Sequence, residues 1–159
     1  MRVIPAAIFL GFTLVSIGWP LGQGALACAI AHNFFAASEV REAVSIFRGS
    51  VAGYDLAGAY SAKVRFVTTQ TYRGEARNTW TLVLTNTLAF ERPKDLEEFI
   101  KYYGMDTIVG VSVSRGYESP DLAQYQNVIQ HPCGPPMMVK RDENNYLFKN
   151  LVELGAVPR

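Results

Sequence analysis

Two cysteines and two histidines are the residues of this sequence that could hold a metal ion or carry out thiol chemistry. Cys28 is followed by His32 four positions later, and His131 is followed by Cys133 two positions later. Thiolate sulfur and imidazole nitrogen suit zinc or copper, so these residues would form a candidate metal site if the two cysteines were neighbours in the fold. The spacings match no recognised metal motif, and a disulfide would consume both sulfurs. The sequence therefore predicts no cofactor and leaves the metal site as an alternative.

Residues for catalysis are not grouped elsewhere in the sequence. Nucleophilic catalysis needs a nucleophile, a base and an orienting group, and the chain has two histidines and no G-x-S-x-G elbow. The carboxylates of Asp95, Glu97 and Glu98 stand beside Lys94 and Lys101, which is typical of a solvated helix face. We therefore predict a protein that is not an enzyme.

The first 27 residues have the three parts of a secretory signal peptide. Arg2 supplies the positive start, residues 3–20 are almost wholly apolar without a charge, and residues 22–27 end in Ala-Leu-Ala. Pro5 and Pro20 interrupt the apolar run, whose length of about 18 residues is at the lower limit for a membrane-spanning helix. We expect cleavage rather than a retained anchor, and hence no membrane span in the mature protein.

The sequence allows more than one cleavage site and more than one final compartment. The small-residue pattern recurs along the alternating alanines, so the cut can fall after Ala27, Ala29 or Ala31. A cut after Ala27 would place Cys28 first, as in a lipoprotein, but Ala25 stands where such signals usually carry leucine. The sequence therefore predicts a secreted or periplasmic protein, with a lipid-anchored form as the alternative.

Export also bears on the two cysteines, because thiols tend to pair in an oxidising compartment. In the chain-entropy model a bond between Cys28 and Cys133 would contribute about 4 to 5 kcal/mol, an upper figure. We expect this disulfide, with free thiols and the metal site as alternatives.

The charge balance of the mature chain excludes one class of partner. Arg2 leaves with the signal, so the remaining Lys and Arg equal the 14 Asp and Glu in number, and they are spread singly. Nucleic-acid affinity depends on neutralising phosphates with clustered cations. We therefore expect neither a nucleic-acid partner nor an acidic membrane surface, and we expect a protein partner.

Alternating apolar residues predict five strands in residues 28–159, which carry no repeat or linker and form one domain. In the first strand, Val44 and Ile46 are assigned to one face and Phe47 and Val51 to the other. The predicted ranges are Glu39–Val51, Tyr60–Tyr72, Thr79–Thr87, Thr107–Ser114 and Tyr125–His131.

Two helices complete the predicted fold. Pro93 opens the first, which Gly104 ends, and the second runs from Asp142 to Leu154. A helix between the third and fourth strands is the connectivity of the OB-fold, a five-stranded Greek-key barrel. The predicted fold is thus mostly β, an antiparallel OB-fold-like barrel with a C-terminal helix.

Several short motifs along the mature chain form a recognisable set: Cys28, the strand Val44–Val51, Val64–Phe66 with the turn Tyr72-Arg73-Gly74, the run Gly104–Gly110, Cys133 and Leu154-Gly155. With these motifs the chain resembles the netrin-type module, the OB-fold of tissue inhibitors of metalloproteinases and related secreted bacterial domains. The resemblance implies that the mature N-terminus lies against the end of the fifth strand.

The resemblance also implies a function through the terminus. Those inhibitors begin Cys-x-Cys and clamp the protease zinc with their first amine and carbonyl, which would give Cys28 and Ala29 a binding role. Here the third residue is Ile30, so the second cysteine that ties the terminus of those inhibitors into the barrel is absent.

Our principal expectation is an exported, non-catalytic binding domain that acts through a protein partner. A metalloprotease inhibitor and a metal-handling protein that uses Cys28, His32, His131 and Cys133 are the alternatives. OB-folds often stack ligands on aromatic residues of the second and third strands, which makes Tyr60, Tyr72 and Trp80 candidates. Trp80 alternates with Leu82 and Leu84, which favours a core position.

Overall fold

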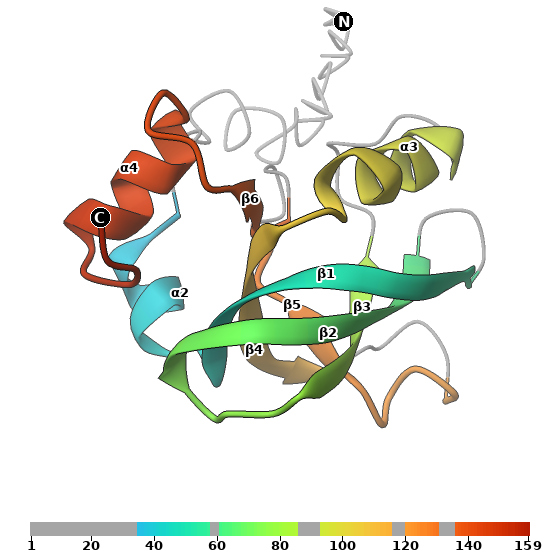
Figure 1. The fold of residues 1–159 in the computed structure, drawn as a ribbon. Helices are drawn as coiled ribbons and strands as arrows, with labels where there is room; N and C mark the ends of the chain where they lie inside the picture. Colours follow the sequence, from blue (N-terminus) through green and yellow to red (C-terminus); the bar gives the residue numbers. More distant parts are fainter. Residues whose placement is uncertain (1–34, 58–60, 86–92, 116–119, 131–135) are drawn as a thin grey trace, which may run out of the picture.

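The computed structural model describes residues 35–57, 61–85, 93–115, 120–130 and 136–159. These residues form six strands and three helices (Figure 1). In chain order they are α2 (Ala37–Arg41), β1 (Ser45–Leu56), β2 (Ser61–Gly74), β3 (Thr79–Thr85), α3 (Pro93–Tyr103), β4 (Thr107–Arg115), β5 (Gln126–Val128), β6 (Met138–Lys140) and α4 (Tyr146–Glu153).

The strands form a closed barrel in the order β1-β2-β3-β5-β4, and β4 pairs back with β1. The β1–β4 pairing runs from Ser45 opposite Val111 to Gly49 opposite Thr107. The helix α3 connects β3 to β4, and α4 follows the last strand. The mostly β, OB-fold-like barrel with these two helices is therefore confirmed. The barrel is mixed rather than wholly antiparallel, because β3 and β5 run parallel.

The fifth strand position is shared by two short strands, β5 and β6, which both pair antiparallel with β4. Opposite these two strands, Gly110 of β4 bonds to residues on both sides of the connection: its carbonyl accepts from the Ile129 N–H and its N–H donates to the Met137 carbonyl. Gln130 and Pro136 form an isolated bridge at the same place. The predicted strand Tyr125–His131 is thus shorter than expected, and β6 was not predicted.

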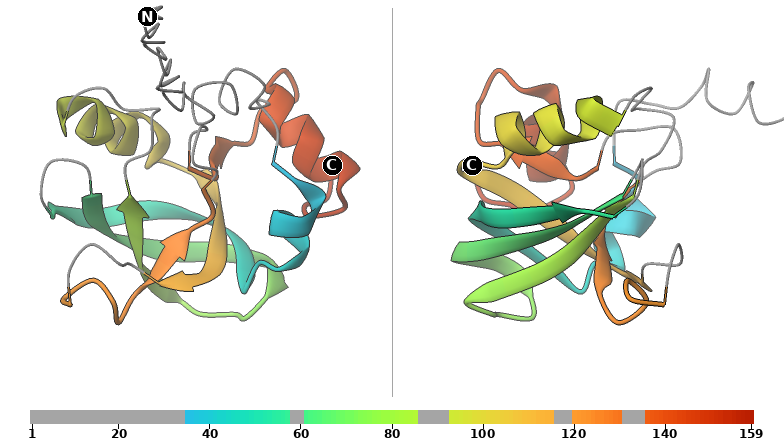
Figure 2. Two further views of the ribbon diagram at one scale, coloured as in Figure 1. Left: turned by 180° about the vertical axis from the view of Figure 1, so that it is seen from behind. Right: turned by 90° about the vertical axis from the view of Figure 1, so that its right-hand side faces the viewer.

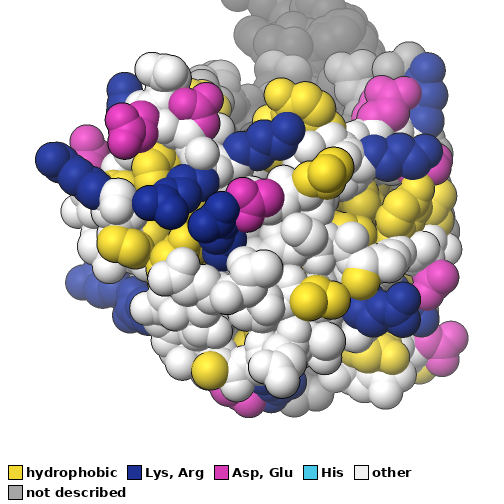
Figure 3. All heavy atoms as spheres, viewed as in Figure 1, with side chains coloured by type: hydrophobic (Ala, Val, Ile, Leu, Met, Phe, Trp, Pro, Cys, Tyr) yellow, Lys and Arg dark blue, Asp and Glu magenta, His cyan; other side chains and the backbone are white. Residues whose placement is uncertain are grey.

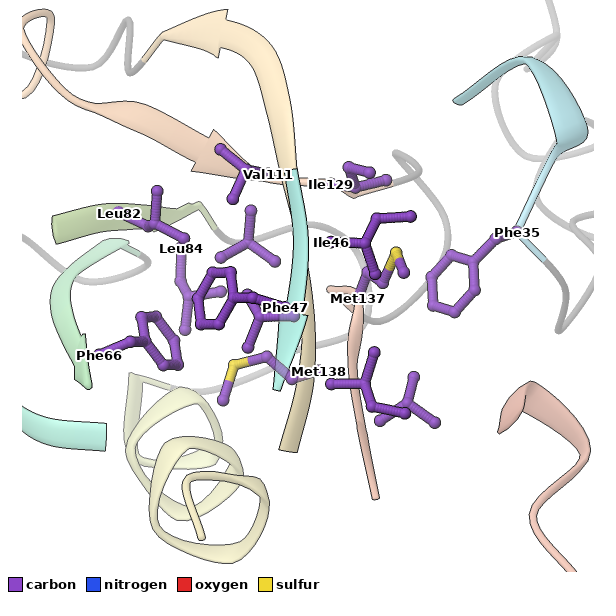
Figure 4. Close-up of a cluster of buried hydrophobic side chains, with 14 of the residues drawn as sticks. Phe35, Ile46, Phe47, Phe66, Leu82, Leu84, Val111, Ile129, Met137 and Met138 are labelled. Carbon is purple, nitrogen blue, oxygen red and sulfur yellow. The ribbon is translucent and has the colours of Figure 1, made fainter. Parts of the chain in front are cut away.

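The core fills the barrel and continues beneath α4. Phe47, Phe66 and Trp80 lie at its centre, and Phe47 contacts both other rings. Leu96 and Ile100 of α3 are buried against the barrel, which accounts for their helical spacing. Figure 4 shows how Phe35 reaches toward Met137 from outside the barrel.

The first predicted strand, Glu39–Val51, is wrong in its bounds, because β1 begins at Ser45 and continues to Leu56. Residues 39–41 belong to α2, whose first turn is closed by the Glu39 carboxylate accepting from the Ala36 N–H at 3.1 Å. Within β1, Ile46 and Phe47 are both fully buried, because Phe47 points into the barrel while Ile46 points the other way, toward Met137 and Phe35 (Figure 4). The two side chains thus lie on opposite faces of β1, as predicted, and both faces are covered at this end of the strand.

The C-terminal helix begins later than its sequence pattern predicts. Asn145 is the N-cap, and its side-chain oxygen accepts from the N–H groups of Leu147 at 2.9 Å and Phe148 at 3.4 Å. Asp142 instead closes a turn by accepting from the Asn144 N–H at 2.8 Å.

The two small helices α2 and α4 lie together on one side of the barrel, away from α3 (Figures 1 and 2). The Phe35 N–H donates to the Asn150 side chain at 3.0 Å, which ties the start of the described chain to α4. Within the ranges that the structure describes, no helix is long and apolar enough to cross a membrane.

Candidate functional site

Most of the residues predicted to bind or to ligate lie outside the described part of the chain. This applies to Cys28, Ala29, His32, His131 and Cys133, and also to Tyr60. The disulfide, the metal site and the N-terminal binding role therefore remain predictions. Among the described residues, no group of three or more His, Cys, Asp or Glu side chains could hold a metal ion.

The two described aromatic candidates occupy different environments. Trp80 is 2% exposed; one side of its indole stacks on Phe47, and the guanidinium of Arg77 lies 4.4 Å from the ring centroid. This placement matches the core interpretation and leaves no free ring face for a ligand. Tyr72 is half-buried and packs against the hydrophobic core near the end of β2. The structure does not bring Tyr72 and Trp80 together as one stacking surface.

A cleft of about 390 Å³ lies elsewhere, between the β1–β2 end of the barrel and the turn that precedes β5. The β1–β2 connection is closed by the Ala57 N–H, which donates to the Ser61 carbonyl at 2.7 Å. The facing turn is closed by the Tyr125 N–H and the Leu122 carbonyl at 3.0 Å. The lining residues are Asp55, Leu56, Ala57, Lys63, Asp121, Leu122, Gln124 and Tyr125.

Lys63 is the central charged group of this cleft. Its ammonium lies 3.3 Å from the Asp55 carboxylate and 6.0 Å from the centroid of the Tyr125 ring. Asp55 and Lys63 face each other across the β1–β2 pairing. The Lys63 ammonium is therefore held in position between a carboxylate and an aromatic face. Its charge is not fully neutralised, because the side chains of Lys63 and Asp55 both remain accessible to solvent.

The cleft offers apolar contact as well as charge. Leu56 is 47% exposed at its rim, whereas Leu122 is buried at its base. Charged side chains of both signs line this side of the molecule (Figure 3). The arrangement can hold a ligand by an apolar contact flanked by an anion and a cation.

The outer face of β2 extends the cleft along the barrel. Arg65 and Val67 are exposed there, and the Arg65 guanidinium lies over Gly53 of β1. The absence of a side chain at Gly53 gives the guanidinium room to lie flat on the sheet. An extended ligand in the cleft would meet these two side chains next.

A second polar cluster joins β1 to α3. The Tyr54 hydroxyl donates to the Glu97 carboxylate at 2.9 Å, and Lys101 lies 2.7 Å from the same oxygen. The Lys101 ammonium and the Tyr54 hydroxyl both lower the pKa of Glu97, and the hydrogen bond to Glu97 raises the pKa of Tyr54. These groups hold each other in their ordinary charge states, so we assign the cluster a structural role.

The sequence did not indicate the cleft residues as a group. Asp55 and Lys63 come from one hairpin, whereas Asp121 and Tyr125 come from a turn about sixty positions further along. The predicted fold class alone could have indicated the region of the cleft. OB-folds often bind ligands at the β1–β2 and β4–β5 connections.

Comparison of the chain with protein-family models, curated proteins and solved structures found no match. The class of protein is therefore defined by its fold and this cleft, as an OB-fold-like barrel with a mixed polar and apolar site at the end where β1 meets β2.

Proposed function

We propose that this chain is an exported binding domain, without catalysis of its own, that holds a segment of a partner protein in the cleft around Lys63. The observation that carries the proposal is the combination of exposed Leu56 with the Asp55–Lys63 pair at one opening. Export rests on the predicted signal of residues 1–27, and we propose a secreted or periplasmic location.

A peptide segment fits the lining better than a compact charged ligand does. Asp55 and Asp121 would repel an anion, while Lys63 would repel a cation. A protein segment can present an apolar side chain to Leu56 and a polar group of either sign beside it. Charge pairs at the rim of such an interface fix its register more than its affinity.

The narrower form of this proposal is membership of the netrin-type family. It is supported by the strand order, by the helix between β3 and β4, and by the closing helix. Inhibition of an extracytoplasmic metalloprotease through Cys28 would follow from that membership. The burial of Phe35 and its hydrogen bond to Asn150 favour this form, because they fix the chain seven residues after the predicted terminus.

Site-specific photocrosslinking tests the proposal. A benzophenone amino acid at Leu56, in the exported protein of its native host, should form an adduct with one main protein, identified by mass spectrometry. The Lys63→Glu change in the same chain should reduce that adduct, because it removes the cation and repels Asp55. The same photoreactive group at exposed Lys94 of α3 is the control. Equal labelling from both positions, or no protein adduct at Leu56, would contradict the proposal.

A further inference from the structure

The turn between α3 and β4 is held firmly in place although it lies at the surface. Asp106 has a left-handed backbone with φ of 53°, which is uncommon for a residue other than glycine. Its carboxylate accepts from Arg48 Nε and Nη2, each at 2.6 Å, and its N–H donates to the Ser50 hydroxyl at 3.0 Å. The Gly104 carbonyl accepts from the Val51 N–H at 2.7 Å. Four hydrogen bonds to β1 therefore fix this turn.

Two large side chains, one in the fixed turn and one at the end of α3, are exposed to solvent. Met105 is 76% exposed, and Tyr102, one turn earlier at the end of α3, is 63% exposed. Tyr102 packs edge-on against Tyr103 with centroids 4.8 Å apart. Tyrosine, methionine and arginine are enriched at the centres of protein interfaces. Because the turn is already ordered, a partner that binds Met105 would lose little conformational entropy there.

The charge beside these side chains is positive. The Lys140 ammonium lies 3.8 Å from the centroid of the Tyr102 ring, and Arg141 follows it at an exposed position. Asp106 is matched by Arg48, whose hydrogen bonds hold the pKa of that carboxyl below its ordinary value, with a smaller contribution from Arg141. Lys140 forms no ion pair with a described carboxylate, and Arg141 donates a long hydrogen bond of 3.5 Å to the Arg159 carbonyl oxygen. Because the charges of Arg48 and Asp106 offset each other, the group is positive overall, and Figure 3 shows Lys and Arg side chains gathered there beside apolar ones.

We propose that the Met105 surface is a docking site for an acidic segment of a partner protein. The surface consists of Arg48, Tyr102, Met105, Asp106, Lys140 and Arg141. An apolar side chain of the segment packs on Met105 and the open face of Tyr102, and its carboxylates pair with Lys140 and Arg141. The surface shares no residue with the cleft around Lys63, so this inference stands independently of the proposed function.

A peptide selection provides the test with a defined probe. Random twelve-residue peptides displayed on phage are selected on the immobilised mature protein, and the most enriched peptide is synthesised and titrated by calorimetry. We expect acidic sequences that contain at least one apolar residue. Their affinity should fall about tenfold or more in the Lys140→Glu/Arg141→Glu variant, because a favourable charge pair becomes repulsive. Met105→Asp should weaken binding to a similar degree, and Met105→Leu should preserve it.

Lys94→Glu is the matched charge control, since Lys94 is exposed at the opposite end of α3, and it should bind as the unaltered protein does. Thermal unfolding of each variant establishes that the barrel is intact. The proposal is overturned if the enriched peptides carry no acidic bias, or if their affinity is the same in the Lys140→Glu/Arg141→Glu variant. Loss of the Leu56 photoadduct with retained peptide binding would overturn the cleft proposal and leave this one standing.

Discussion

The indole of Trp80 stacks on the ring of Phe47, with centroids 5.9 Å apart and planes 6° from parallel. The two residues come from β3 and β1, which are not neighbours in the sheet. Their contact therefore crosses the interior of the barrel. Phe66 of β2 meets Phe47 edge to face at 5.8 Å, so three strands converge on one phenyl ring.

Removal of that ring is expected to destabilise the barrel strongly. Phe47→Ala should lower the free energy of unfolding by about 3 to 5 kcal/mol, the usual range for a large buried aromatic residue. Trp80 is the only tryptophan after residue 27, so its fluorescence during urea denaturation measures the change directly. Val67→Ala is the control, because Val67 is 45% exposed and should change stability by about 0.5 kcal/mol or less. Equal effects at both positions would mean that Phe47 is not central to the core.

The sequence predicts the regular part of the barrel and fails where long-range pairing decides the structure. Alternation in β2 is preserved, with Val64 and Phe66 buried and Arg65 and Val67 exposed, because a half-buried strand imposes period two on its own residues. The burial of Ile46 on the other face of β1 depends on packing against Phe35 and Met137, which are distant in the sequence. No local pattern encodes it.

The same reasoning explains β6 and the cleft. Residues 138–140 form a strand because β4 offers them an edge, although the neighbouring prolines argue against pairing when the sequence is considered alone. Lys63 and Tyr125 become neighbours only after the parallel β3–β5 pairing brings the turn before β5 beside the hairpin. The residue types were visible in the sequence, and their proximity was not.

The pairing of Asp106 with Arg48 predicts a specific pH dependence. Hydrogen bonds from Arg48 lower the pKa of Asp106, so the folded protein binds this proton less readily than the unfolded chain does. The contribution to stability is therefore present above the pKa of the unfolded carboxyl and is lost as the pH falls through the folded pKa. Arg48→Gln should raise the pKa of Asp106, measured by NMR titration of its side-chain carbon. The stability difference between Arg48→Gln and the unaltered protein should disappear at acid pH. A carboxyl pKa that is the same in both proteins would contradict the pairing.

Substitution of two glycines with positive φ allows the cost of backbone strain to be measured apart from the cost of a steric clash. Gly155 ends α4 with φ of 66° and has open space around it, whereas Gly74 has φ of 79° and packs closely on the backbone of Val44 and Ser45. Gly155→Ala should cost about 1 kcal/mol, the cost of a left-handed backbone. Gly74→Ala should cost more, because its Cβ also meets the Val44 carbonyl. Thermal or urea unfolding of the two variants measures both costs, and a Gly74→Ala protein no less stable than Gly155→Ala would contradict the close approach.

The described structure places the chain segments that flank both cysteines on the same side of the barrel. Phe35 is buried beside Met137, and Ile129 belongs to the same cluster (Figure 4). Cys28 precedes Phe35 by seven residues, and Cys133 stands between Ile129 and Met137 in the sequence. Seven extended residues reach at most about 25 Å, so the placement of Phe35 beside Met137 is compatible with the predicted bond.

The predicted Cys28–Cys133 disulfide is tested on protein taken from its native compartment. Its mass under non-reducing conditions should be lower by two hydrogens than after reduction, and no thiol should be alkylated. Cys133→Ser should lower the free energy of unfolding by about 2 to 5 kcal/mol, the range for loss of a native disulfide, and Cys28→Ser should match it because both remove one bond. Reduction of the unaltered protein should have the same effect on stability and no effect on either variant. Two alkylatable thiols in the native material would refute the bond and would favour the alternative in which Cys28, His32, His131 and Cys133 bind a metal ion.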